Sequence, residues 1–216
     1  MNYTALIVAA GKGTRTGLGY NKMFYVLKKY QMTVLEKTTK LFLEDDRCKQ
    51  VVIVTNPVDM KDVVLGHENE KIVHVNGGPR RQDSVLQGLM ATSEDVVLIH
   101  DGARPWLEIE NVNLILEAME TEEAAILAVK LKDTIKVVKD GYIHHTIDRE
   151  QLISAQTPQA FKTDMIIECY IKAKNENIFA TDDAQIVEMC SNIKIKVVEG
   201  SYLNNKITTK DDIDKN

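Results

Sequence analysis

The sequence predicts an α/β fold with a mainly parallel sheet and helices on both of its faces. Short apolar runs rich in β-branched residues, such as 51–54 and 96–99, are typical of strands buried on both sides. Between these runs lie segments whose apolar residues recur at helical spacing, and the connections are short. This alternation indicates βαβ units, so we expect a Rossmann-like core. A hairpin signal near residue 140 interrupts the alternation and predicts a protruding β-hairpin arm.

The individual elements follow from apolar periodicity and from turn residues. The expected strands are 4–9, 51–54, 71–75, 96–99, 124–129 and 194–198. The expected helices are 34–43, 58–66, a helix capped by Asp83 or Ser84 and reaching Met90, 109–122, 163–174, and a helix that Thr181-Asp182-Asp183-Ala184 starts and that reaches Met189.

The arm is expected at about residues 133–149. Two β-rich runs, 134–138 and 142–147, flank Lys139-Asp140-Gly141, and Asp-Gly between such runs is a strong hairpin signal. The hairpin is mostly polar, so we expect it to project from the core and to need a partner surface. A second copy of the chain is the simplest partner, which makes a homodimer the expectation. Residues 1–216 otherwise read as a single domain.

Composition and charge exclude several classes of protein. The net charge of −5 and the pI of about 5.6 lack the basic excess of a nucleic-acid-binding protein. No apolar run has the roughly 18 to 20 residues of a membrane span, and we see no signal-peptide pattern at the N-terminus. Cys48, Cys169 and Cys190 are far apart and match no zinc or disulfide spacing. We therefore expect a cytoplasmic protein with free thiols.

The polar residues with chemical potential follow the ends of expected strands. A glycine-rich loop, 9–22, follows the first strand, Gly77, Gly78, Asp83 and Ser84 follow the third, and 100–105 follows the fourth. Ligands of open α/β sheets bind beyond the carboxyl ends of the strands. These segments should therefore meet at one edge of the sheet and form the site.

The glycine-rich loop fits neither of two common phosphate motifs. A dinucleotide fingerprint needs a third glycine three residues after Gly13, and Gly17 comes one place late. The lysine and hydroxyl pattern of a P-loop is absent. The loop instead suits a triphosphate, with Arg15 as a two-pronged donor and Lys22 as a point charge. A glycine-rich turn with solvated charges remains the plain alternative.

Several residues near the expected site have both a functional and a structural interpretation. Asp101 can hold Mg²⁺ together with phosphate oxygens, or cap a turn. His100 reads as a structural histidine, and Arg104 is either a residue of the site or one that only pins its loop. Asp182 and Asp183 look like a metal pair but also like a helix start, and the arginines at 80 and 81 fit either phosphate or solvent. Spacing supports no nucleophile with a base, and phosphoryl transfer needs none because positioning and charge suffice.

Taken together, the motifs resemble a known enzyme family. They are Ala9-Ala10-Gly11-Lys12-Gly13-Thr14-Arg15 with Lys22, Gly77-Gly78 with Arg81-Gln82-Asp83-Ser84-Val85, His100-Asp101-Gly102-Ala103-Arg104-Pro105, Ala155-Gln156-Thr157-Pro158-Gln159-Ala160-Phe161, Thr181-Asp182-Asp183-Ala184 and Glu199-Gly200-Ser201-Tyr202. In order and spacing they are similar to the 2-C-methyl-D-erythritol 4-phosphate cytidylyltransferases of the non-mevalonate isoprenoid pathway. The resemblance covers nearly the whole chain.

The resemblance implies a reaction and roles for particular residues. CTP and the polyol phosphate would give 4-diphosphocytidyl-2-C-methyl-D-erythritol and diphosphate, with Mg²⁺ near Asp101. Arg15 and Lys22 would stabilise the transition state, and Arg149 and Lys206 would position the acceptor phosphate with help from Thr134. The remaining implied substrate-binding residues are Ala9, Ala10, Gly11, Gly13, Gly77, Asp83, Ser84, Asp101, Ala103 and Arg104.

The resemblance also implies a homodimer that exchanges the arm, and it leaves alternatives open. Asn21 stands where proline is frequent in the family, so we expect local geometry to differ beside Lys22. A ribitol-5-phosphate cytidylyltransferase would share the fold and the chemistry. A catalytically silent nucleotide-binding module would not need to keep both donor and acceptor cations. A nicotinamide oxidoreductase is disfavoured by the late glycine and by the lack of an acidic residue closing a second strand.

Overall fold

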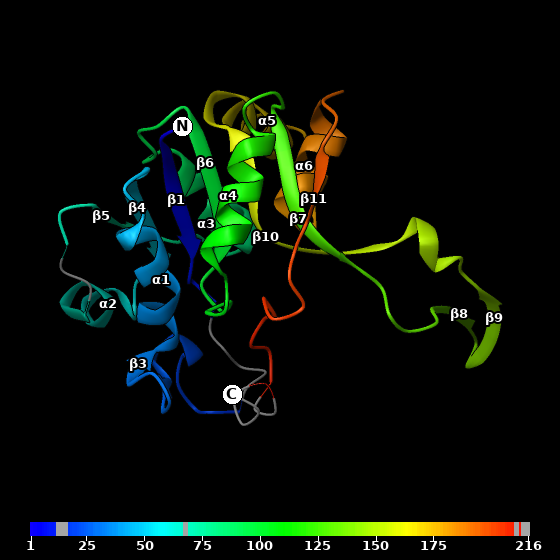
Figure 1. The fold of residues 1–216 in the computed structure, drawn as a ribbon, viewed down its shortest axis with the longest axis horizontal. Helices are drawn as coiled ribbons and strands as arrows, with labels where there is room; N and C mark the ends of the chain where they lie inside the picture. The colour runs from blue at the N-terminus through cyan, green and yellow to red at the C-terminus, as the bar shows by residue number, and fades with distance from the viewer. Residues whose placement is uncertain (12–16, 67–68, 210–211, 213–216) are drawn as a thin grey trace.

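A seven-stranded sheet forms the centre of the protein. The computed structural model describes residues 1–11, 17–66, 69–209 and 212. The strands lie side by side in the order β11-β7-β10-β6-β1-β4-β5 (Figure 1). Their bounds are β1 Tyr3–Val8, β4 Cys48–Thr55, β5 Ile72–Asn76, β6 Val96–Asp101, β7 Ala124–Lys130, β10 Ile153–Lys162 and β11 Lys196–Glu199.

The sheet is parallel except at β10. β1 pairs in parallel with β4 and β6, β4 with β5, and β7 with β11, whereas β10 runs antiparallel to both β6 and β7. The carboxyl ends of β1, β4, β5 and β6 therefore meet at one edge, as expected from the sequence. The expected Rossmann-like, mainly parallel sheet is confirmed.

Helices cover both faces of this sheet. Their bounds are α1 Val34–Glu44, α2 Met60–Gly66, α3 Arg81–Leu89, α4 Ile109–Ala118, α5 Thr163–Asn175 and α6 Asp183–Cys190. Along β1, Ala5 and Ile7 join the core that includes residues of α1 and α4, whereas Leu6 between them joins the core that includes residues of α3, α5 and α6. Successive side chains of a strand point to opposite faces, so each buried strand contributes to both cores.

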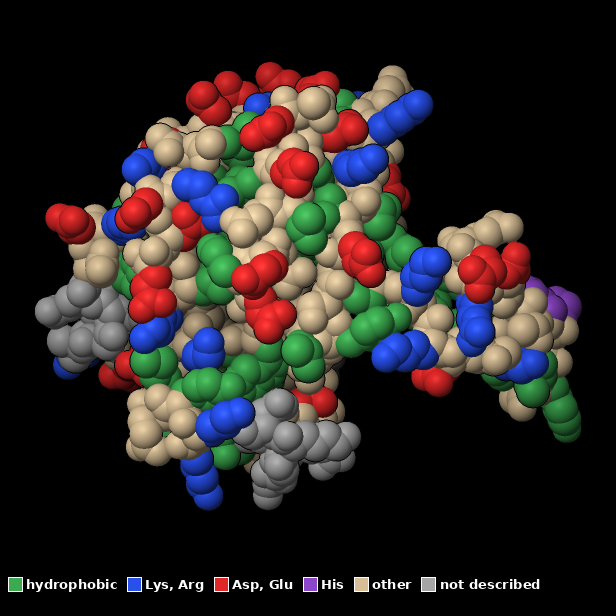
Figure 2. Space-filling view, in the orientation of Figure 1, with side chains coloured by type: hydrophobic (Ala, Val, Ile, Leu, Met, Phe, Trp, Pro, Cys, Tyr) green, Lys and Arg blue, Asp and Glu red, His purple; other side chains and the backbone are tan. Residues whose placement is uncertain are grey.

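The expected hairpin arm is also confirmed. β8, Lys136–Lys139, pairs with β9, Tyr142–Thr146, in an antiparallel hairpin separate from the main sheet. Asp140 and Gly141 both have positive φ angles, 51° and 84°, the geometry of the primed hairpin turns that Asp-Gly favours. Figure 1 shows the arm reaching far from the sheet, and Figure 2 shows apolar side chains at its end. Tyr142 and Ile143 are 80% and 67% exposed.

Two local expectations were wrong, and one strand was not expected. Helix α3 begins at Arg81, and neither Asp83 nor Ser84 caps it, because both lie inside its first turn. Helix α4 ends at Ala118, four residues before the expected end, because the chain turns there to enter β7. β10 was not foreseen as a strand, because polar residues and Pro158 hide it, and its register shifts between Ala155 and Gln159.

Short elements complete the fold. A 3₁₀ turn, η2, spans Lys22–Phe24, and β2, Val26–Leu27, pairs with β3, Met32–Thr33. A second 3₁₀ turn, η3, spans Arg149–Gln151 at the end of the arm segment. Among the described residues, no helix is both long and apolar enough to cross a membrane. Acidic and basic side chains are interspersed over the face of the core that Figure 2 shows.

Candidate active site

A large cleft opens at the carboxyl edge of the parallel strands. Its volume is about 1240 Å³, which is room for a nucleotide and a second small substrate. Strands β1 and β6 contribute Val8 and Asp101, and the loops after β4 and β5 contribute further walls. The described residues that line it are Val8, Ala10, Gly11, Gly17, Gly19, Tyr20, Asn21, Lys22, Met23, Asn56, Pro57, Val58, Asp59, Gly77, Gly78, Pro79, Arg80, Arg81, Ser84, Asp101, Ala103, Lys206 and Thr208.

Bare backbone at Gly77 shapes one wall of the cleft. The Gly77 N–H donates to Thr55 O at 2.7 Å, which ties the loop to the end of β4. A Cβ at Gly77 would lie 2.7 Å from Ala10 Cβ and 2.9 Å from Ser84 Oγ, so only glycine fits. Ser84 Oγ accepts from Gly78 N at 3.1 Å and bonds Arg80 O at 3.0 Å. The Ser84 hydroxyl therefore holds this loop as well as lining the cleft.

Lys22 lies at the buried end of the glycine-rich loop. Its side chain is 7% exposed, and Nζ donates to Ile207 O at 2.6 Å. Asn21, the residue beside Lys22 for which we expect unusual local geometry, caps η2 by accepting from Met23 N. Its Nδ2 donates to Asp59 Oδ2 at 2.6 Å. Asn21 thus anchors the backbone beside Lys22 to the loop before α2, a contact that a proline could not make.

Asp101, at the end of β6, is surrounded by cations. Its carboxylate lies 2.7 Å from Lys206 Nζ, 3.6 Å from Arg81 Nη2 and 3.8 Å from Arg104 Nε. Burial alone would raise the pKa of this carboxyl, but the charges of Arg81 and Lys206 outweigh that effect and hold the pKa well below its usual range. Asp101 is therefore an anion at neutral pH that orients the Lys206 ammonium in the cleft.

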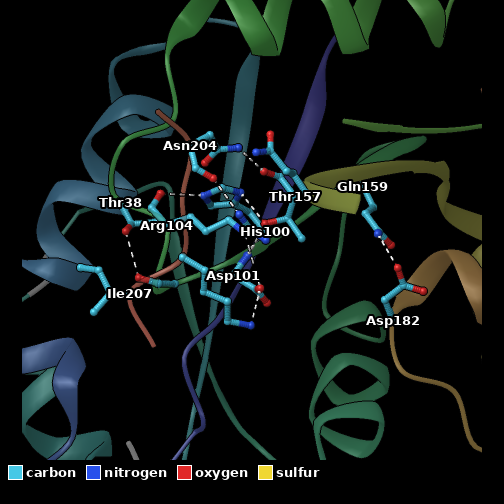
Figure 3. Close-up of polar contacts among 12 residues, drawn as sticks. Thr38, His100, Asp101, Arg104, Thr157, Gln159, Asp182, Asn204 and Ile207 are labelled. Atoms are coloured by element: carbon cyan, nitrogen blue, oxygen red, sulfur yellow. Dashed lines mark hydrogen bonds and ion pairs between the residues drawn. The ribbon is translucent and has the colours of Figure 1, made fainter. Parts of the chain in front are cut away.

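A C-terminal segment, 204–207, is fixed across the end of β6 (Figure 3). Arg104 Nη1 donates to Asn204 O at 2.7 Å, and the fully buried Asn204 donates through Nδ2 to Thr157 O at 2.8 Å. Ile207 N donates to Ala103 O at 2.9 Å. These bonds fix the segment that carries Lys206 and that accepts the bond from Lys22, so one segment places both lysines.

His100 has a structural role, as expected. The ring is fully buried, its Nε2 lies 3.1 Å from Arg104 O, and its Nδ1 lies 3.1 Å from Thr157 Oγ1. Thr157 Oγ1 accepts from Asp101 N, so its own proton goes to Nδ1, and Nε2 carries the ring proton. Burial lowers the pKa of His100 to about 4, and the ring is neutral at pH 7.

The aspartate pair at residues 182 and 183 starts a helix. Asp182 caps α6 by accepting from Gln185 N, and Gln159 Nε2 donates to Asp182 Oδ2 at 2.9 Å. Asp183 is fully buried and pairs with Arg81. Within the described part of the chain, no group of three or more His, Cys, Asp or Glu residues could hold a metal ion.

The residues of the cleft can hold Mg²⁺ only together with the phosphates of a substrate. Mg²⁺ is usually held by one or two carboxylates, several waters and substrate phosphates rather than by an all-protein cage. Asp101 lines the cleft and is ionised, so it can supply the single carboxylate that this mode needs. Its Oδ2 bonds Lys206 and its Oδ1 lies 3.6 Å from Arg81 Nη2, so Mg²⁺ would share this carboxylate with two cations.

The structure brings only some of the expected site residues together. Ala10, Gly11, Lys22, Gly77, Ser84, Asp101, Ala103 and Lys206 line the cleft. Ala9 is buried beneath it, and Asp83 pairs with Arg80 at 2.8 Å beside it. Thr134 and Arg149 lie exposed on the arm segment, where Arg149 Nη1 bonds Lys132 O. Gly13 and Arg15 lie outside the described residues.

Sequence reasoning missed several residues that shape the site. Asn56 and Asp59 line the cleft, and their side chains bond each other. Thr157 and Asn204 hold the segment with Lys206. Asn56-Pro57 at a strand end was the one visible signal, since short polar residues at strand ends often reach the carboxyl edge. Asn204 had no signal, because its partner is 47 residues away.

Fold and cleft together define a class of enzyme. An open, mainly parallel sheet whose ligand cleft lies beyond its carboxyl edge, with a glycine-rich loop after the first strand and with lysines and aspartates in the cleft, fits an α/β nucleotidyltransferase. A family model described as 2-C-methyl-D-erythritol 4-phosphate cytidylyltransferase matches residues 3–215, and the chain belongs to that family.

Individual relatives agree over the full chain. A 2-C-methyl-D-erythritol 4-phosphate cytidylyltransferase of Geobacillus thermodenitrificans is 41% identical over 99% of this chain and 94% of its own length. A crystal structure of 4-diphosphocytidyl-2C-methyl-D-erythritol synthase from Anaerococcus prevotii superposes with a TM-score of 0.85 at 33% identity, covering 99% of this chain and 93% of its own. The Francisella tularensis enzyme gives a TM-score of 0.86 at 30% identity, with 100% and 98% covered.

Proposed function

We propose that the chain joins CTP to 2-C-methyl-D-erythritol 4-phosphate in the cleft at the carboxyl edge of its sheet. An oxygen of the acceptor phosphate attacks the α-phosphorus of CTP in line, a new P–O bond forms, and the bond from the α-phosphorus to the bridging oxygen breaks. Diphosphate leaves with that bond's electrons, and 4-diphosphocytidyl-2-C-methyl-D-erythritol remains. Membership of the family supports this reaction, since its members carry the name of this transfer.

One observation carries the assignment of residues: Lys22 and Lys206 reach the same cleft and are fixed by the same C-terminal segment. Lys22 Nζ bonds Ile207 O, and Lys206 Nζ bonds Asp101. Two ammonium groups held in one cleft can neutralise two phosphate groups that would otherwise repel each other. Lys22 acts on the triphosphate, because it ends the glycine-rich loop, and Lys206 acts on the acceptor phosphate.

The wall of the cleft around Gly77 takes the base. Gly77, Gly78 and Ser84 line this wall, and the close packing of Gly77 against Ala10 and Ser84 holds it in place. The N–H groups of Gly77 and Gly78 already donate to Thr55 O and Ser84 Oγ, so this wall would recognise the edge of a pyrimidine through its oxygen acceptors. Asp101 would hold Mg²⁺, which when bound neutralises charge on the triphosphate. The residue roles of Arg15 and Gly13 remain those that the family resemblance implies.

Assembly and location belong to the same proposal. Arg149 and Thr134 lie outside this chain's own cleft, on an arm with exposed apolar residues. An arm that inserts into a second copy would bring both residues to the neighbouring acceptor site, and would bury Tyr142 and Ile143. Three free, buried cysteines support a reducing compartment such as the cytoplasm.

The test is a substrate panel. Purified protein with CTP and Mg²⁺ should release diphosphate when 2-C-methyl-D-erythritol 4-phosphate is added. Mass spectrometry should detect 4-diphosphocytidyl-2-C-methyl-D-erythritol. Turnover with ribitol 5-phosphate in its place, without turnover on the methylerythritol compound, would overturn the choice of acceptor. Binding of CTP without any diphosphate release would support the silent binding module instead.

A further inference from the structure

A row of alternating charges runs from the core between two helices into the cleft. Asp183, at the start of α6, receives two bonds from the Arg81 guanidinium, at 2.9 and 2.8 Å. Arg81 Nη2 lies 3.6 Å from Asp101 Oδ1, and Lys206 Nζ lies 2.7 Å from Asp101 Oδ2. Four side chains from α6, α3, β6 and the C-terminal segment thus alternate negative and positive, ending at an ammonium in the cleft.

The inner end of this row is rigid. Asp183 is fully buried, and Tyr170 on α5 donates its hydroxyl proton to Asp183 Oδ1. The helix start that carries Asp183 is fixed from β10, because Gln159 bonds both Asp182 Oδ2 and Ala184 N at 2.9 Å. Asp183 therefore cannot move with a ligand, and neither can the guanidinium that both its oxygens grip.

The outer end of the row, the Lys206 ammonium, needs to be held in place by its neighbours. A lysine side chain has four rotatable bonds and loses about 2 kcal/mol of rotamer freedom when it is held in one geometry. Asp101 supplies that restraint for Lys206, and the bond uses only one of the three donors of the ammonium. Asp101 in turn has Arg81 as the cation on its second oxygen, which keeps that carboxylate facing the cleft when Lys206 shares its charge with a phosphate.

We propose that Asp183 and Tyr170 are positioning residues for the reaction, and that they act through Arg81 and Asp101 on Lys206. Neither lines the cleft, so neither touches a substrate. This inference rests on the proposed role of Lys206 at the acceptor phosphate. It gives a functional meaning to Thr181-Asp182-Asp183-Ala184 that the reaction itself leaves unexplained.

A double-mutant cycle tests the proposal. Asp183→Asn should raise KM for methylerythritol phosphate about 10-fold, within the loss expected when a group is displaced by roughly an ångström. In a Lys206→Ala background the same substitution should have no further effect on the acceptor KM, because the group it positions is gone. If the increases in acceptor KM caused by the two single substitutions multiply in the double variant, the inference is overturned.

The chain contains a matched control. Tyr3, Asp45 and Arg47 form the same arrangement at the amino end of the sheet: the Tyr3 hydroxyl donates to Asp45 Oδ2 at 3.0 Å, and Arg47 Nη2 donates to it at 2.7 Å. Asp45→Asn should lower the melting temperature and leave the acceptor KM unchanged. An equal rise of acceptor KM in both Asp→Asn variants would mean a general loss of stability and would overturn the inference.

A milder pair of variants tests the inference even if Asp183→Asn fails to fold. Tyr170→Phe keeps the Asp183–Arg81 pair and removes one hydroxyl bond, so it should raise the acceptor KM about threefold, while Tyr3→Phe should not. An unchanged acceptor KM in Tyr170→Phe would overturn the inference. Wild-type protein in the same assay separates the two claims: absent turnover refutes the proposed function, whereas normal turnover with a multiplicative cycle refutes only this positioning role.

Discussion

Replacing Lys22 by methionine should abolish most of the activity and leave the fold largely intact. The methionine keeps the buried, unbranched stem and removes only the ammonium, which the structure places at the cleft with Nζ 2.6 Å from Ile207 O. Because the side chain is only 7% exposed, its charge acts in a poorly screened site. The substitution therefore removes one positive charge from the place where, under the proposed function, negative charge develops.

The magnitude follows from the chemistry of such sites. Removing one preorganised donor to a developing oxyanion costs about 2.7–4 kcal/mol, so kcat should fall about 10²- to 10³-fold. The lost bond to Ile207 O costs about 1.5–3 kcal/mol of stability, and relief from burying an ammonium offsets part of that. The activity should therefore fall far more than the melting temperature would suggest.

The assay is diphosphate release at saturating CTP and acceptor, with thermal unfolding measured on the same samples. Lys71→Met is the matched control, because Lys71 Nζ also bonds backbone carbonyls, Leu43 O at 3.2 Å and Asp45 O at 3.4 Å, away from the cleft. Lys71→Met should keep kcat within about twofold. A Lys22→Met enzyme within a few-fold of wild type would refute the role given to Lys22.

Two further predictions concern the arm and the buried histidine. Arg149→Ala should raise KM for the acceptor more than KM for CTP, and mixing it with Lys22→Met protein should restore part of the activity in mixed dimers; no recovery, with dimers shown to exchange, would place Arg149 in its own chain's site. Folded His100 has a pKa of about 4 against 6.5 when unfolded, so the unfolded chain binds more protons between these values, and stability should fall as pH drops from 6.5 to 4 by up to about 3 kcal/mol. His100→Gln should flatten that part of the pH profile of thermal unfolding, and an unchanged slope would contradict the neutral buried ring.

The periodicity of the sequence was sufficient for most of the fold. Buried strands such as β4 and β6 are continuous apolar runs, and the Asp140-Gly141 turn requires two positive φ angles that this dipeptide accommodates. β10 could not be found in this way. Its inner residues are polar because they hold neighbouring elements in place, since Thr157 bonds Asp101 N and Gln159 fixes the start of α6.

Site residues could be predicted where their position follows from a nearby strand end. They could not be predicted where their position depends on partners far away in the sequence. Gly77 and Asp101 stand at strand ends, so topology alone brings them to one edge, and Lys22 reaches it at the end of the loop that follows β1. Arg81 and Asp183 are 102 residues apart, and no sequence pattern pairs them. The same limit applies to Lys206, whose place in the cleft depends on contacts of Asn204 with Arg104 and Thr157.

The acceptor preference of the wild-type enzyme tests the proposed reaction most directly. With CTP and Mg²⁺ in excess, kcat/KM should be measured for 2-C-methyl-D-erythritol 4-phosphate and for ribitol 5-phosphate by the release of diphosphate. We expect turnover of the methylerythritol compound with little or none of the ribitol compound. Equal or greater turnover of ribitol 5-phosphate would contradict it.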